Sequence, residues 1–122
     1  MTLYLLSVPH DSETEPTMAT MDPDELEATL AAVGAFNESL EAADALRFAG
    51  GLHPPSTATT IDGSGETATV APGPFVEAPE YLGGLWVIEA ADDAAAIAWG
   101  TLAAEALGGR VEVRAFQDVP SG

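Results

Sequence analysis

The sequence predicts an α+β domain in which two helices cover one face of an antiparallel sheet. Residues 1–8 and 82–89 are apolar at both odd and even positions, a pattern typical of strands in the middle of a covered sheet. Helical segments alternate with the strands, which gives the order strand, helix, strand, hairpin, strand, helix, strand. This is the ferredoxin-like βαββαβ order with a hairpin insertion, and its first and third main strands are the central pair.

Both predicted helices have boundary signals. Asp22 is a favourable N-cap and Pro23 suits the first helical position, so the first helix is expected over residues 23–43. The second helix is rich in alanine. We expect it to begin at the Asp pair 92–93 and to stop at the Gly pair 108–109.

The other two main strands, residues 46–52 and 111–116, have one apolar face. Because side chains alternate along a strand, the apolar positions are expected to face the helices. The residues expected on the helix side are Leu46, Phe48, Val111 and Val113. Those expected on the opposite side are Arg47, Ala49, Glu112 and Arg114.

Residues 58–61 and 67–70 flank the turn sequence Asp62-Gly63-Ser64-Gly65, which predicts a short hairpin. Residues 71–79 carry three prolines and one glycine. That segment is expected to be an ordered loop without regular structure.

The chain has 122 residues and a mass of 12.5 kDa, which is one domain (1–122) of common size. Three basic and twenty acidic residues give a net charge of −17. This charge argues against nucleic acid and anionic membranes as partners. With no cysteine and two histidines, no metal site and no cofactor are expected. No targeting or membrane-spanning segment is recognisable, so the expected location is the cytoplasm.

One face of the predicted sheet has no helix over it, although both central strands carry apolar side chains there. A second copy of the chain is the simplest cover for such a face. Two sheets packed in this way form a homodimeric α/β barrel.

Residues 72–80 read PGPFVEAPE, and Leu82-Gly83-Gly84 follows. This segment resembles the nine-residue motif DGPFAETKE of one branch of the YCII-related family. The matching residues are Gly73, Pro74, Phe75, Glu77 and Glu80. Pro72 and Pro79 stand where the motif has Asp and Lys. The resemblance implies a ferredoxin-like domain that dimerises. Some relatives are suspected enzymes with a His–Asp pair, and others accompany sigma-factor regulators.

The candidate ligand site lies on the uncovered sheet face. Arg47 and Arg114 are expected to point into the barrel with Glu112, which would make a positive spot in an acidic protein, suited to a small carboxylate or phosphate. The alternative is that these residues form structural ion pairs. Trp86 and Phe75 are the apolar candidates for ligand contact.

His10 at the end of the first strand and His53 after the second are the candidate general bases. Each also fits an ordinary loop residue. Three functions therefore remain open: a binding or accessory protein for a small anionic ligand, a cofactor-free lyase, isomerase or hydrolase, and an interaction module.

Overall fold

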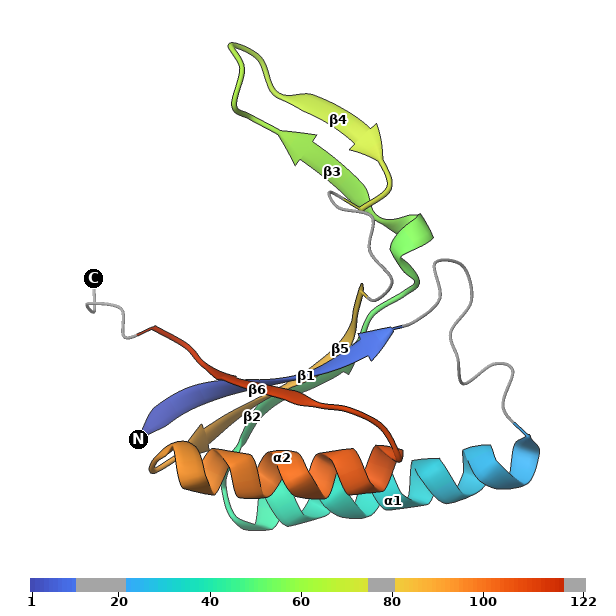
Figure 1. Cartoon of the computed structure of the whole chain (residues 1–122), viewed down its shortest axis with the longest axis vertical. Helices are drawn as coiled ribbons and strands as arrows, with labels where there is room; N and C mark the ends of the chain where they lie inside the picture. The colour runs from blue at the N-terminus through green and yellow to red at the C-terminus, as the bar shows by residue number, and fades with distance from the viewer. Residues whose placement is uncertain (11–21, 75–80, 118–122) are drawn as a thin grey trace.

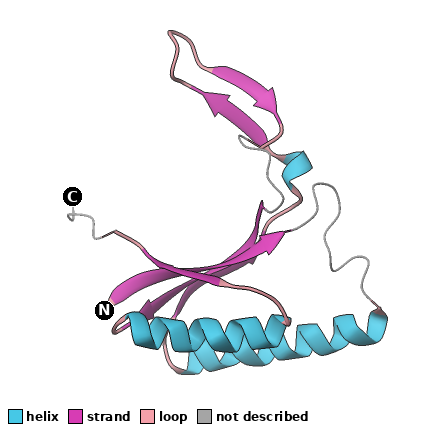
Figure 2. Ribbon diagram, viewed as in Figure 1, coloured by secondary structure: helices cyan, strands magenta, loops and turns pink. Residues whose placement is uncertain are grey.

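The computed structural model describes residues 1–10, 22–74 and 81–117. The backbone folds into an α+β structure (Figure 1), with strands and helices separated into layers (Figure 2). The elements are β1 (Thr2–His10), α1 (Pro23–Ala42), β2 (Leu46–Gly51), a 3-10 turn η2 (Pro55–Thr57), β3 (Thr59–Asp62), β4 (Thr69–Pro72), β5 (Tyr81–Ala90), α2 (Asp93–Leu107) and β6 (Glu112–Ala115).

The main sheet has the strand order β2-β5-β1-β6, with each neighbouring pair antiparallel. Both helices lie against the same face of this sheet (Figure 1). The two strands with apolar residues on both faces, β1 and β5, are the central ones, as predicted. The ferredoxin-like arrangement expected from the sequence is therefore confirmed.

The hydrophobic core lies between the sheet and the helices. Along β5 the buried positions alternate, because every second side chain points to the helices. The ring of Phe36 on α1 meets Trp86 edge-to-face at a centroid distance of 5.1 Å. The buried apolar residues are Tyr4, Leu6, Phe36, Leu40, Ala45, Trp86, Ile88, Ala90, Ala96 and Ala103.

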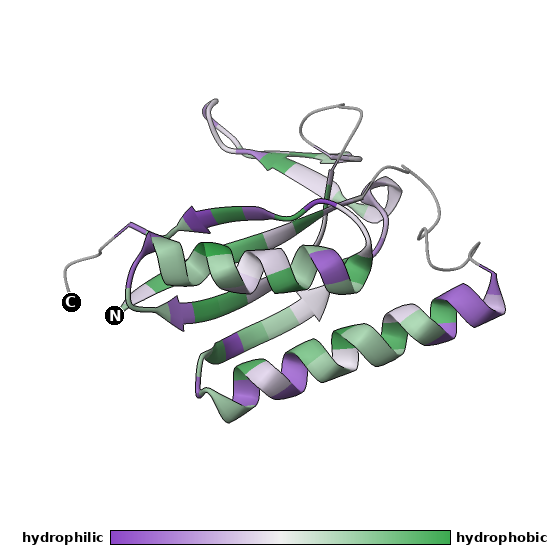
Figure 3. Cartoon of the chain, turned by 60° about the horizontal axis from the view of Figure 1, so that its bottom comes forward, coloured by the Kyte–Doolittle hydropathy of each residue, from purple (hydrophilic) through white to green (hydrophobic). Residues whose placement is uncertain are grey.

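The helix boundaries follow the capping signals in the sequence. The carboxylate of Asp22 accepts a hydrogen bond from the Asp24 backbone at the start of α1, and Asp92 does the same for Ala95 in α2. Gly108 ends α2 in the left-handed conformation, with φ at 69°. The first turn of α1 is strongly hydrophilic (Figure 3).

Side-chain hydrogen bonds pin each helix to a central strand. The Trp86 indole on β5 donates to Asn37 on α1 at 2.8 Å. The Tyr4 hydroxyl on β1 donates to Asp93 on α2 at 2.7 Å. This bond to a carboxylate, with a smaller contribution from burial, raises the pKa of Tyr4 to about 12.

The sequence-based prediction for the faces of β2 is wrong from Phe48 onward. The register shifts between Leu46 and Phe48, so that Phe48 pairs with Val87 and Ala49 pairs with Trp86. A bulge at this point inserts one residue and reverses the alternation that follows. Phe48 therefore lies on the face away from the helices, where 60% of it is exposed, and Ala49 takes the other face.

The hairpin of β3 and β4 forms a separate two-stranded sheet that projects away from the helices (Figure 1). Ala71 and Pro72 belong to β4, so the loop predicted from residue 71 begins two residues later. In the turn, Ser64 donates to the Asp62 carboxylate from its hydroxyl and its backbone N–H, which lowers the pKa of Asp62.

Candidate functional site

The sheet face turned away from the helices, called the open face below, carries two rows of side chains across the strands. In the first, Arg114 pairs with Leu5, Leu5 with Val87, and Val87 with Phe48. In the second, Glu112 pairs with Ser7, Ser7 with Leu85, and Leu85 with Gly50. Apolar side chains thus occupy the middle of the open face, and one edge is charged.

Glu112 and Arg114 lie on the open face, as the alternation of β6 predicts. On the other side of β6, Val113 packs against the core and lies close to Gly100 of α2. The Arg114 guanidinium donates to the Glu112 carboxylate from Nε at 2.9 Å and also from its terminal nitrogen. Both side chains are well exposed in the single chain, at 74% for Arg114 and 57% for Glu112.

A pocket of about 860 Å³ lies beside the start of β6 and is called the β6 pocket below. Pairing between β1 and β6 ends at Ser7 and Glu112, whereas β1 continues to His10, so β6 leaves a gap along this edge. The pocket is lined by Leu5, Ser7, Val8, Pro9, Tyr81, Leu82, Ala104, Arg110, Val111, Glu112 and Arg114.

Arg110 is a pocket residue that the sequence analysis missed. The predicted strand began at Val111, which left Arg110 in the preceding turn. A signal for it was present, because residues 110, 112 and 114 share one parity and therefore one side of an extended chain. The structure brings Arg110, not Arg47, to the same pocket as Arg114.

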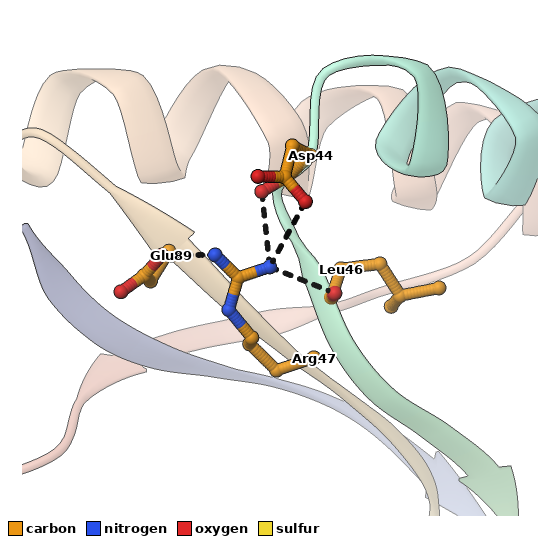
Figure 4. A network of polar contacts seen from close by, with 4 residues as sticks. All are labelled: Asp44, Leu46, Arg47 and Glu89. Atoms are coloured by element: carbon orange, nitrogen blue, oxygen red, sulfur yellow. Dashed lines mark hydrogen bonds and ion pairs between the residues drawn. The ribbon is translucent and has the colours of Figure 1, made fainter.

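Arg47 lies at the opposite edge of the sheet, on β2. Three strand spacings separate β2 from β6, which corresponds to roughly 14 Å. The Arg47 guanidinium pairs with Glu89 and Asp44 and donates to the carbonyl oxygens of Asp44 and Leu46, both at 3.0 Å (Figure 4). These contacts tie the turn after α1 to the bulge of β2.

Comparison with known families matches residues 2–118 to the YCII-related domain. The chain belongs to the YCII-related family. The match spans every element from β1 to β6, so the family resemblance of the sequence is confirmed over the whole fold. Comparison with curated proteins gives no match.

The two histidines of this YCII-related chain lie in different places. His10 ends β1, and its backbone pairs with Tyr81, which lines the β6 pocket. The His10 side chain is outside the described part of the structure. His53 is exposed and follows β2, directly before the buried Pro54 and Pro55. The backbone positions therefore bring His10, and not His53, next to the pocket wall.

The structure describes one of the two apolar candidates for ligand contact, Trp86. Trp86 is buried on the helix side of the sheet, where it contacts Phe36 and Asn37, and it does not line the β6 pocket. Phe75 lies outside the described residues. Tyr81, the residue that follows the motif segment in the sequence, lines the pocket.

Within residues 1–10, 22–74 and 81–117, no three His, Asp or Glu side chains gather in a way that could hold a metal ion. In the same described part of the chain, no helix has the length and apolar character needed to cross a membrane.

Proposed function

We propose that this YCII-related protein is a homodimeric binding or accessory protein for a small anionic ligand. The observation that carries the proposal is that Arg110 and Arg114 line one pocket. They are two of only three basic residues in a chain of charge −17. An anion approaching most of such a surface meets repulsion, so a pair of arginines at one pocket selects where it binds.

The position of Glu112 defines the charge of the site. Glu112 lies between the two arginines in sequence, and it occupies one side of the Arg114 guanidinium. The charged residues of the pocket lining are these two arginines and this one glutamate, a difference of one positive charge. A singly charged ligand matches this balance, and a planar carboxylate matches the geometry of a guanidinium.

The proposed dimer packs two open faces together. Leu3 and Phe48 are large apolar residues of this face that remain exposed in the single chain. Exposed contiguous apolar surface of this kind usually marks an interface. Because Arg114 lies at the edge of the same face, the packed dimer would place the β6 pocket at the margin of the barrel.

Sedimentation equilibrium tests the dimer. The wild-type protein should have twice the mass of the 12.5 kDa chain. Phe48→Asp adds a charge to the open face and should shift the protein to monomer. Ile97→Asp is the matched control, because Ile97 is 57% exposed on α2, away from this face. A wild-type monomer, or equal effects of the two variants, would contradict the dimer.

An enzyme is the second candidate, because the backbone of His10 adjoins the pocket wall. In this alternative His10 acts as the general base and the arginines stabilise a developing anion. His53 is the weaker base candidate, since it lies on an exposed loop after β2 at the opposite edge of the sheet. Chemical change of a bound organic acid, lost in His10→Gln while binding persists, would favour the enzyme over the binding protein.

We also propose a branch of the family and a cellular location for this protein. The five motif matches in residues 72–80 support membership of the DGPF branch of the family. A cytoplasmic location is supported by the absence of cysteine, since proteins of oxidising compartments often depend on disulfides.

A further inference from the structure

We infer that the ligand of the β6 pocket is an amphipathic organic acid, with one carboxylate and an apolar body of several carbon atoms. This inference rests on the proposed anion binding and adds the chemical class of the ligand. It follows from the combination of charged, polar and apolar side chains in the lining of the pocket.

Polar residues of the pocket lie on the open face. Ser7 and Glu112 are cross-strand partners there, and Arg114 follows Glu112 on the same side of β6. The Ser7 hydroxyl and the arginine guanidinium are hydrogen-bond donors. A carboxylate held by Arg114 would therefore find a further donor on the neighbouring strand.

The apolar residues of the pocket lie on both sides of the sheet. On the helix side, Val8 shares the parity of the buried core residues of β1, and Val111 has that parity on the approach to β6. Ala104 of α2 completes this wall. The register shift between Val8 and Pro9 reverses the alternation at the start of β5, so Leu82 pairs with Pro9 on the open face, where 46% of Leu82 is exposed.

This mixed lining argues against the simpler ligands. Inorganic phosphate or acetate would use the polar residues and leave the exposed surface of Leu82 in water. A neutral apolar molecule would make no use of the guanidinium donors of Arg110 and Arg114. A volume of about 860 Å³ is within the range of small-molecule sites, so one compound can contact both the polar and the apolar residues.

The test is calorimetric titration of the full chain with acetate, butyrate, hexanoate and octanoate at constant ionic strength. Affinity should rise with chain length, by up to about fourfold for each added methylene that enters the wall. Octanol, the neutral match for octanoate, should bind at least about tenfold more weakly. Leu82→Asn should flatten the chain-length dependence and leave acetate affinity unchanged.

Arginine variants assign the carboxylate end. Arg110→Gln and Arg114→Gln should each weaken octanoate binding by about fivefold or more. Arg47→Gln removes the same charge at the far edge of the sheet and should leave binding within about twofold. Thermal melts of all the variants establish that they are folded before the titrations are compared.

The outcomes separate this inference from the proposed function. Equal affinity for acetate and octanoate, with the Arg110 and Arg114 effects retained, would overturn the amphipathic class and leave anion binding intact. No binding of any carboxylate at tens of millimolar would overturn both. An effect of Arg47→Gln as large as that of Arg114→Gln would show that only net charge matters, and would also overturn both.

Discussion

The ionisation of Tyr4 is coupled to the fold. Its hydroxyl is buried against the first turn of α2, where it donates to Asp93 and also lies near the charge of Asp92. Ionising the phenol would break this bond and place two negative charges in contact. The folded structure therefore holds Tyr4 in its neutral form.

This coupling predicts a specific loss of stability at alkaline pH. The pKa of Tyr4 is raised to about 12, above the value of about 10 expected in the unfolded chain. Its contribution is therefore fully present below about pH 10 and is lost as pH rises through about 12. Urea unfolding from pH 9 to pH 12 should show a steeper fall for wild type than for Tyr4→Phe. Parallel curves would contradict this linkage.

Replacing Arg114 distinguishes a role of this residue in ligand binding from a role in stabilising the fold. Because Arg114 and Glu112 are both more than half exposed, their ion pair is screened by water, and Arg114→Met should change the free energy of unfolding by less than about 1 kcal/mol. Octanoate binding should be lost in the same variant. A fall in stability of about 3–5 kcal/mol would mean that the pair is buried in the assembled protein, and would contradict the ligand role.

At the scale of elements, α2 and β6 pack closely at Gly100, where there is no space for a larger side chain. A Cβ at this position would lie 2.5 Å from Cγ2 of Val113. Gly100→Ala should therefore lower the free energy of unfolding by about 1–3 kcal/mol through overpacking. Gly34 on α1 has open space around it, and Gly34→Ala should raise stability by about 0.5–1 kcal/mol.

The double variant Gly100→Ala with Val113→Ala provides the control for this packing prediction. Removing the valine methyl groups should recover part of the loss caused by Gly100→Ala alone, since the two changes act at one contact. Urea denaturation midpoints of the wild type, of the single variants Gly100→Ala and Val113→Ala, and of the double variant measure the effect. Equal stability of Gly100→Ala and Gly34→Ala would show that α2 does not pack tightly on β6.

The sequence predicted the elements whose signals are local. The helix caps Asp22, Asp92 and Gly108 act on neighbouring backbone groups. Their positions can therefore be recognised from the sequence alone. The bulge of β2 is different, because it depends on pairing with β5 and on the contacts that Arg47 makes with Glu89. Strand alternation alone therefore misplaced Phe48.

The candidate site was predictable only in part, for the same reason. The parity of β6 placed Glu112 and Arg114 on the open face. It carried no information on which other strand edge they approach, since that depends on strand order and on where pairing with β1 ends. The predicted cluster therefore included Arg47 in place of Arg110.

The charge of the whole molecule sets its response to salt. A net charge of −17 on a 12.5 kDa chain makes the compact state repel itself. The α1 helix adds to this, with acidic residues in its first turn and no basic residue in its last. Packing two such chains into the proposed dimer would double the charge that must be screened.

We therefore expect the melting temperature to rise when NaCl is increased from about 10 mM to about 0.5 M, a range in which the screening length falls from about 30 Å to below 8 Å. KCl should act equally, because screening does not depend on the cation. Glu38→Gln removes one exposed charge from α1 and should raise the melting temperature more at low salt than at high salt. A melting temperature independent of salt would mean that the acidic residues are spaced widely enough for water alone to screen them. It would also remove self-repulsion as an obstacle to packing the two open faces together.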